Sequence, residues 1–348
     1  MKIPFWAILV LGIAGSLAML CIAALAGTAD IDPVTGLRIL AGAFSASPLS
    51  PDISPAAAGI ILDIRLPRIL LAWLAGAAVS VSGAIMQSVL RNPLASPFTL
   101  GVSAGASLGS GLVMLAGTAF PFAGALAILS GLAVPAAGFV SGLAAIFLLL
   151  AFSRSLDPRL DTHTVILSGM VLSLFINAAL TLVSALAGQE MSRLILWQMG
   201  SFALKGWTPV AVLALPVFLG ILAATAYSRE LDILTFGDEE ASAIGVDIKK
   251  HRGILIALAS ALTGATVAFV GVIGFVDLAV PHLVRKITGP GHLKAIPLSA
   301  LAGGSAMVLA DLAARTLIPP LDLPVGAITA IAGAPVFAFI YLSGRTKG

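Results

Sequence analysis

The sequence predicts an all-α, polytopic membrane protein that crosses the bilayer about ten times. Hydrophobic residues make up 59% of the chain and charged residues only 10%. The mean hydropathy of +1.09 lies outside the range of soluble domains. Seven stretches without Asp, Glu, Lys or Arg each reach at least 22 residues, and a bilayer crossing needs about 20 apolar residues. The stretches are 3–29, 69–90, 92–153, 162–189, 206–228, 253–276 and 323–344.

The expected spans follow from these stretches in order. The longest one contains prolines at 93, 97 and 121 and fits two spans, about 99–117 and 122–152. Another span lies between Lys294 and Leu317. The segment 278–288 is too short for an ordinary span but must join two long neighbours, so we expect a short tenth helix there. The whole chain, 1–348, is therefore expected to form one transmembrane domain.

The distribution of basic residues predicts the orientation. With ten crossings and an internal N-terminus, thirteen Lys and Arg lie inside and six outside. We therefore expect both termini in the cytoplasm, and the net charge of +3 then reflects topology rather than nucleic-acid binding. A cleaved signal peptide is the alternative for the first segment, because Lys2 precedes an apolar run that ends in Ala24-Leu25-Ala26. Cys21 is the sole cysteine, so neither a disulfide framework nor a cysteine metal cluster is expected.

Two segments predict an inverted repeat. Gly76–Ile85 and Gly264–Ile273 match at five of ten positions at an offset of 188 residues, and the same offset relates Pro93 to Pro281. Five crossings separate the two segments, so the halves would have opposite orientations, as in many transporters. Chance similarity between helices rich in Gly, Ala and Val is the alternative explanation.

Gly101, Gly105 and Gly109 recur every four residues and predict close helix packing in the membrane. The same stretch reads G-x-S-x-G around Ser103 and Ser107, which leaves an intramembrane serine hydrolase as an alternative function. A catalytic serine needs a base within hydrogen-bond reach, and the four histidines fall mostly near helix ends or in loops. Packing is therefore the favoured interpretation.

The sequence contains no P-loop, no H-E-x-x-H and no paired intramembrane carboxylates. Energy for active transport would therefore come from a partner. The longest internal loop, 229–252, has three acidic residues after Gly237 and a second glycine at 245. Acidic residues favour a helix start and glycine a helix end, so we expect a helix of about two turns across this loop. A solvated connector is the alternative.

Taken together, seven blocks resemble the FecCD permeases of type II ABC importers, which take up iron-siderophores, haem and cobalamin. The blocks run in family order along nearly the whole chain. They are RLPR (65–68), SGAIMQSVLRNPLASPFTLGVSAGASLG (82–109), WQMGSF (197–202), GDEEASAIGV (237–246), GFVDLAVPHLVR (274–285), LADLAART (309–316) and LPVGAITAIAGAPVF (323–337).

The resemblance implies a dimer of ten-helix permeases on two cytoplasmic ATPases with an external binding protein, and we expect the dimer to be a homodimer. It implies no catalytic residue, metal or cofactor on this chain, since ATP and Mg belong to the ATPase. The docking residues for the binding protein would be Arg65, Arg68 and Arg315. The ATPase-coupling residues would be Gly237, Asp238, Glu239, Glu240, Ala241, Gly245 and Val246. The cytoplasmic gate would comprise Asn92, Leu94, Thr162 and His163.

The docking arginines have an alternative explanation, in which they reach toward lipid headgroups and Arg315 pairs with Asp311 at i,i+4. Two departures from the family pattern also stand out. Asp277 replaces the usual glycine of GFVG, near the expected outer end of the seventh span, and Gly291-His292-Leu293-Lys294 replaces an acidic-His-Arg group.

The sequence thus predicts the permease subunit of an ATP-driven importer in the inner (plasma) membrane. The cargo would be an iron chelate (ferric siderophore or haem) or cobalamin, and an oxyanion such as molybdate is a further alternative. An intramembrane serine hydrolase and an ATP-independent transporter are the alternatives. Nothing in the sequence selects the ligand.

Overall fold

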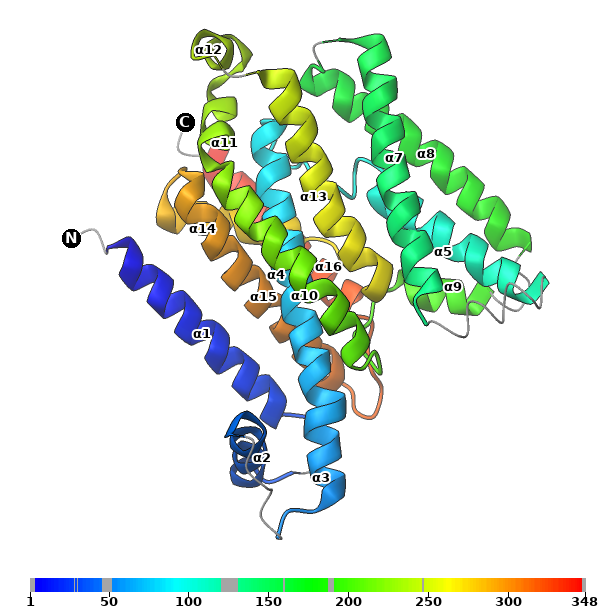
Figure 1. The fold of residues 1–348 in the computed structure, drawn as a ribbon, viewed down its shortest axis with the longest axis vertical. Helices are drawn as coiled ribbons and strands as arrows, with labels where there is room; N and C mark the ends of the chain where they lie inside the picture. The colour runs from blue at the N-terminus through cyan, green and yellow to red at the C-terminus, as the bar shows by residue number, and fades with distance from the viewer. Residues whose placement is uncertain are drawn as a thin grey trace.

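The computed structural model describes residues 4–27, 29, 31–45, 52–119, 131–158, 160–186, 191–245 and 247–345, whose regular elements are all helices (Figure 1). A π-helical turn, Ile60–Arg65, joins α3 to α4. The helices are α1 (Phe5–Leu25), α2 (Pro33–Ser45), α3 (Pro55–Gly59), α4 (Leu66–Val89), α5 (Val102–Ala119), α7 (Ala133–Leu156), α8 (Thr162–Leu186), α9 (Met191–Gln198), α10 (Trp207–Ala226), α11 (Ser228–Phe236), α12 (Asp238–Ala243), α13 (Ile248–Val270), α14 (Val276–Thr288), α15 (His292–Thr316) and α16 (Val325–Arg345).

The long helices confirm a polytopic, all-helical membrane protein. Within the described residues, seven helical segments are long and apolar enough to cross a bilayer, and α5 and α16 contribute shorter apolar segments. Helix α14 has 13 residues, as expected of the short helix. Each of the ten predicted spans therefore contains a helix. The start of the predicted span 122–152 falls partly outside the described residues, and α7 begins at Ala133.

Helix α4 forms the centre of the bundle (Figure 1), and nearly all of its residues are buried. Its closest neighbour is α15, which it meets through small residues. A Cβ atom placed on Gly76 would touch the Gly303 carbonyl and lie 2.5 Å from the Met307 Cβ, and one placed on Gly303 would touch Ser80. The two backbones are therefore in direct contact, the arrangement that small residues allow between membrane helices.

The predicted glycine packing is confirmed for two of its three residues. A Cβ atom on Gly105 would lie 2.8 Å from the Ala145 Cβ, and Gly109 lies against Ser141, so both pack on α7. Gly101 does not belong to this face. It precedes α5, has a φ of +98° and lies next to Ser173 of α8, because the chain turns there before the helix begins.

The two matched segments of the predicted repeat lie on α4 and α13, which pack together through the Ser82 hydroxyl, 2.7 Å from the Thr263 hydroxyl. The end of α4 and the start of α13 lie at the same end of the molecule, so these helices run antiparallel, as an inverted repeat requires. The two segments differ in backbone conformation at one pair of matched glycines. Gly83 lies within α4, whereas Gly271 ends α13 with a φ of +79°.

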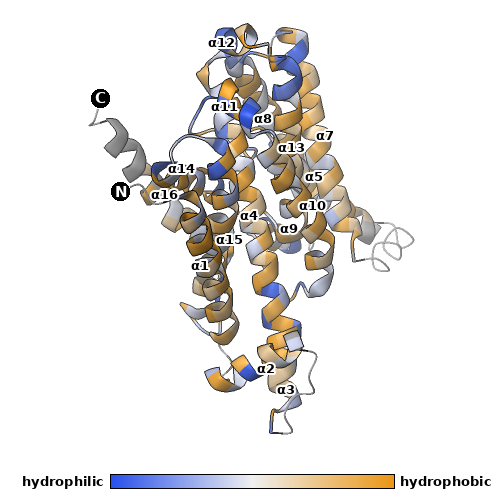
Figure 2. Ribbon diagram, turned by 60° about the vertical axis from the view of Figure 1, so that its left-hand side comes forward, coloured by the Kyte–Doolittle hydropathy of each residue, from blue (hydrophilic) through white to orange (hydrophobic). Residues whose placement is uncertain are grey.

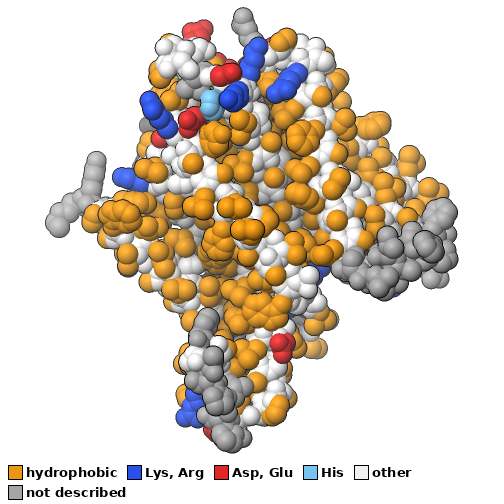
Figure 3. Space-filling model, in the orientation of Figure 1, with side chains coloured by type: hydrophobic (Ala, Val, Ile, Leu, Met, Phe, Trp, Pro, Cys, Tyr) orange, Lys and Arg blue, Asp and Glu red, His pale blue; other side chains and the backbone are white. Residues whose placement is uncertain are grey.

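Polar and apolar residues divide the molecule into zones. Figure 2 shows hydrophilic residues concentrated at the end formed by α11 and α12, and Figure 3 shows apolar side chains over the middle of the surface. Large apolar side chains on the outer helices are exposed, such as Phe175 of α8 at 73% and Leu222 of α10 at 65%. So much exposed apolar surface fits contact with lipid rather than water.

Candidate functional site

Asp238 joins three segments at the polar end of the molecule. It opens α12 directly after Gly237, whose φ of +134° turns the chain between α11 and α12. Its Oδ1 accepts hydrogen bonds from Nη2 of Arg91 at 2.9 Å and from Nη2 of Arg252 at 2.8 Å. Arg91 follows α4, and Arg252 lies in the first turns of α13. Charge-assisted bonds of this length are among the stronger ones in proteins, so α12 is tied to both helices.

Arg252 extends this connection to the loop before α8. Its side chain is completely buried, and Nη1 donates to the Leu160 carbonyl at 2.7 Å. Asp161 follows, and its carboxylate accepts from the His163 amide at 3.0 Å, which caps the start of α8. The segment that contains Thr162 and His163 is therefore linked through one arginine to Asp238.

The predicted coupling residues lie on and around α12. Ala241 is buried, whereas Glu239 and Glu240 are exposed, and Gly245 ends the segment with a φ of +86°. The predicted helix is present, shorter than two full turns at six residues. Val246 lies outside the described residues. A polar hollow of about 840 Å³ borders the helix and is lined by Asp238, Glu239, Ser242, Ala243, Asp247, Ile248 and Lys249.

The predicted gate residues Asn92 and Leu94 form a compact turn after α4. The Asn92 side-chain oxygen accepts from the Leu94 amide at 2.9 Å, and the Leu94 side chain is 46% exposed. Thr162 is buried and His163 is exposed at the start of α8. No hydrogen bond or ion pair joins the two pairs within the described residues. The connection runs through Arg91, Asp238 and Arg252.

The three predicted docking arginines lie together at the opposite end of α4, and their charged groups turn inward. Arg65 is 4% exposed and donates to the carbonyls of Ala24 at 3.2 Å and Leu25 at 2.9 Å. Arg315 is 7% exposed and donates to the Ala23 carbonyl. Both arginines thus satisfy carbonyls at the end of α1 that lack partners within the helix.

Arg68 occupies an ionic cluster beside them. Its Nη2 lies 2.9 Å from Asp311 and its Nη1 lies 2.7 Å from Asp322. Asp311 also lies 3.7 Å from Nε of Arg315, so the expected i,i+4 pair forms. The side chain of Arg68 is 11% exposed and that of Asp322 is 36% exposed. Arg68 is thus paired with a carboxylate, that of Asp322, which solvent can reach.

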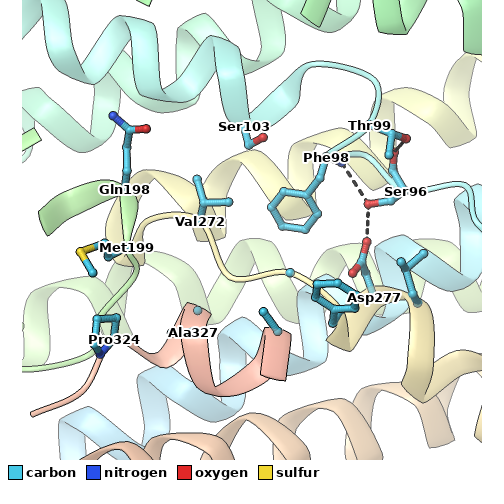
Figure 4. A pocket seen from close by; sticks show the side chains of 15 residues that line it. Ser96, Phe98, Thr99, Ser103, Gln198, Met199, Val272, Asp277, Pro324 and Ala327 are labelled. Atoms are coloured by element: carbon cyan, nitrogen blue, oxygen red, sulfur yellow. Dashed lines mark hydrogen bonds between the residues drawn. The ribbon is translucent and has the colours of Figure 1, made fainter. Parts of the chain in front are cut away.

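A cavity of about 420 Å³ lies between the turn after α4, the start of α14 and α16 (Figure 4). Ser96, Ser103 and Asp277 are among its polar lining residues. Asp277 is 1% exposed, and its Oδ2 accepts a hydrogen bond from the Ser96 hydroxyl. The departure from glycine at this position therefore places a buried carboxylate in the wall of an open cavity.

The geometry around the G-x-S-x-G serines gives the hydrolase alternative no support. Ser103 lines the cavity and Ser107 is buried. In the described part of the chain, the hydrogen bonds of histidine side chains reach Ser88, Asp232 and the Asp247 carbonyl instead. Neither serine thus has a histidine base.

A serine, a histidine and an aspartate do meet elsewhere. His292 Nε2 lies 2.5 Å from the Ser88 hydroxyl, and Nδ1 lies 2.5 Å from Asp232. Ser88 is 5% exposed and His292 is 2% exposed, so a substrate has no open path to this hydroxyl, which also lies 2.9 Å from the Ala84 carbonyl. Asp232 also accepts from the His292 amide at 2.9 Å, and the cluster therefore joins α4, α11 and α15 structurally.

The sequence did not predict either polar cluster near α11 and α12, neither the one around Asp238 nor the one around His292. The Arg91 and Asp238 side chains are 147 residues apart in the chain, and Ser88 and His292 are 204 apart. A signal exists for Arg252, which immediately precedes a charge-free stretch and therefore needs a partner if it is buried. His292 is 2% exposed, so its ring faces the protein interior rather than a partner surface.

The fold and these sites define a polytopic helical membrane protein with a polar end at α11 and α12. The chain belongs to the FecCD transport family, whose model matches residues 15–343. It is 37% identical over 295 residues to the cobalamin import system permease protein of Halobacterium salinarum, with 85% of this chain and 76% of that protein covered. It is 38% identical over 293 residues to the hemin transport system permease protein of Yersinia pestis, with 83% of this chain and 84% of that protein covered.

A solved structure agrees with this membership. The chain superposes with a TM-score of 0.81 on a transporter assigned to the metal-chelate type of ABC transporters in an inward-facing conformation. Sequence identity is 28%, and the match covers 97% of this chain and 99% of the other. The chain is thus a permease subunit of the type II ABC importer class.

Proposed function

We propose that this chain carries a chelate or macrocycle of the siderophore, haem or cobalamin kind inward through ten membrane crossings, with both termini in the cytoplasm. Two copies would form the pathway, a binding protein would deliver the ligand, and a cytoplasmic ATPase dimer would supply the energy. The observation that carries the proposal is the Asp238 cluster, because it links the exposed α12 to both segments expected to form the gate.

The cluster explains how a partner's movement reaches the pathway. A shift of α12 displaces Asp238, and both arginines must follow or lose a charged partner. Arg91 lies next to Asn92 of the first gate segment, and Arg252 holds the Leu160 carbonyl before the second. Rigid, well-packed connections of this kind convert small shifts into discrete changes of state. ATP binding and hydrolysis on the partner would thus switch the gate between outward and inward access.

The binding protein would dock at the end of the bundle opposite α12. Helix α4 has 24 residues, a length of about 36 Å, so its two ends lie on opposite sides of a bilayer core of about 30 Å. Arg65 and Arg315 would support the docking surface indirectly, because they hold the end of α1 in place. Arg68 would bind an acidic residue of the binding protein in exchange for the partly exposed Asp322.

Site-directed crosslinking tests the ATPase contact. In a Cys21→Ala background, Glu239→Cys places a thiol on exposed α12, and Arg38→Cys serves as the control at the opposite end, where the Arg38 side chain is 59% exposed. We expect position 239, and not position 38, to crosslink to the partner ATPase. Crosslinking from neither position, with no copurification of an ATPase, would contradict the proposal.

Transport by the reconstituted complex tests the proposed ligand class and the proposed source of energy. The chain, the ATPase and the binding protein are reconstituted in liposomes and supplied with haem, cobalamin or a ferric siderophore. We expect uptake of one ligand to require ATP and the ATPase. Uptake that persists without the ATPase would indicate an ATP-independent transporter instead.

A further inference from the structure

The cavity beside Asp277 lies where the first gate segment meets the start of α14. Ser96, Phe98 and Thr99 contribute one wall from the turn after α4, and Val272 and Phe275 contribute another from the linker before α14 (Figure 4). The remaining wall comes largely from the start of α16. Its volume of about 420 Å³ suffices for a substantial part of a small-molecule ligand.

The linker between α13 and α14 brings Asp277 to mid-depth in the bundle. A Cβ atom on Gly83 of α4 would touch the Asp277 carbonyl, and the neighbouring Ser82 contacts the middle of α13 through Thr263. Asp277 therefore lies at the level of the helix centres. The sequence predicted a position near the outer end of α13. Phe275 adopts a left-handed φ of +69°, and such conformations concentrate at functional sites in proteins.

The Asp277 carboxylate is incompletely satisfied. The Ser96 hydroxyl donates to Oδ2. Its Oδ1 is buried without a hydrogen-bond partner, and no Lys or Arg in the described ranges pairs with the carboxylate. A buried charge normally needs a counter-charge or a full set of hydrogen bonds. Oδ1 therefore has capacity to accept a hydrogen bond from a molecule in the cavity.

We propose that Asp277 forms a subsite on the translocation pathway for N–H donor or cationic groups of the transported chelate. This inference rests on the proposed function and narrows its ligand class. An amide-rich macrocycle or a cationic ferric hydroxamate fits the subsite, because each presents donors to the free carboxylate oxygen. A chelate rich in free carboxylates is disfavoured, because like charges repel most strongly in a cavity of low polarity.

The electrostatic part is tested with charged thiol reagents on the complete complex. In a Cys21→Ala background, Ser103→Cys places a thiol on the cavity, and Leu204→Cys provides a control, since Leu204 is 87% exposed and is not among the cavity-lining residues. We expect a cationic methanethiosulfonate to react with position 103 at least about tenfold faster than an anionic one, relative to the control, because a charged cleft concentrates opposite charges.

Two further variants identify the source of this preference. Asp277→Asn keeps the size of the side chain and removes its charge, so the preference at position 103 should fall to the control ratio. Ser96→Ala removes the hydroxyl donor but keeps the charge, so the preference should persist. A preference unchanged by Asp277→Asn would overturn the proposal.

Uptake then tests the ligand class. Native and Asp277→Asn complexes are compared with cobalamin, hemin and ferrioxamine B as ligands in ATP-loaded liposomes. We expect the native complex to carry cobalamin or ferrioxamine B, and Asp277→Asn to reduce that uptake by roughly tenfold, the effect of about one charged hydrogen bond, with ligand-stimulated ATP hydrolysis retained. Uptake of hemin alone, unchanged by the substitution, would refute the subsite while leaving the proposed function intact. Uptake of no ligand by the native complex would refute both.

Discussion

Asp238 lies 2.8 Å from Arg252, whose side chain is completely buried at the start of α13. The same carboxylate oxygen binds Arg91 at 2.9 Å, so a residue of the surface helix α12 satisfies an arginine in the interior. A buried guanidinium without a counter-charge is costly. This cost keeps α12 attached to the bundle, and it makes the position of α12 and the position of the gate segments interdependent.

Asp238→Asn should therefore uncouple transport. It keeps the shape of the side chain but leaves Arg252 without a charged partner, and we expect a stability loss of about 1–3 kcal/mol, because Asp238 is partly exposed. Uptake per ATP hydrolysed should fall several-fold. Thermal unfolding in detergent and uptake assays measure the two effects. Glu239→Gln is the matched control on the same helix, and equal effects of both substitutions would contradict the linkage.

Asp311→Asn should destabilise the opposite end of the molecule much more than loss of an exposed ion pair. Asp311 is fully buried between Arg68 and Arg315, so its neutralisation should cost about 3 kcal/mol or more. Asp52→Asn breaks the exposed pair with Arg38 and should cost less than about 1 kcal/mol. Denaturation midpoints of the two variants provide the measurement. Similar midpoints would show that the Arg68 cluster does not stabilise the fold.

Gly303→Ala should disrupt the contact between α4 and α15. The added methyl group would meet Ser80 and the Gly76 carbonyl, and overpacking of this kind costs about 1–3 kcal/mol or more. Gly15→Ala is the control, because a Cβ atom at Gly15 of α1 has no atom within 4 Å. The control should be neutral or stabilising by about 0.5–1 kcal/mol, owing to the better helix propensity of alanine. Thermal stability in detergent distinguishes the two, and a harmless Gly303→Ala would argue against direct backbone contact.

Ser88→Ala should affect stability and leave no catalytic phenotype. It removes the hydroxyl that is hydrogen-bonded to His292, at a cost of about 1–2 kcal/mol. A fluorophosphonate probe should label neither the native protein nor the Ser103→Ala, Ser107→Ala and Ser88→Ala variants. Labelling of the native protein that disappears in one of these variants would restore the serine hydrolase as a function of this chain.

The membrane class and the helix positions were predictable from the sequence because both depend on local composition. Charge-free stretches of bilayer length require helices, since a backbone in lipid must satisfy its own hydrogen bonds. The four-residue spacing of Gly105 and Gly109 is also a local property of the sequence, and it predicted helix packing correctly. Gly101 was assigned wrongly to that face because its left-handed φ depends on the turn that precedes α5, which periodicity does not reveal.

The assignment of candidate roles to residues was predictable only as far as the family motifs reached. Arg65, Arg68 and Arg315 were placed together correctly at one end of the bundle, and their docking role stays a prediction. Their orientation was not foreseen. The sequence does not show that α1 ends with unsatisfied carbonyls beside Arg65 and Arg315, or that Asp322 lies 2.7 Å from Arg68 across 254 residues of chain.

By itself, the sequence determined that this protein is a helical membrane permease, where its helices lie and which segments match the family. These properties follow from hydropathy and from short motifs, both of which act over a few turns of chain. Only the tertiary structure decided which charges are partnered: Asp238 with Arg91 and Arg252, and Asp277 with Ser96 but with no cation among the residues that the structure describes. The physical reason is that burial of a charge becomes costly only after distant helices have packed, so its partner is fixed by the fold and not by its neighbours in the chain.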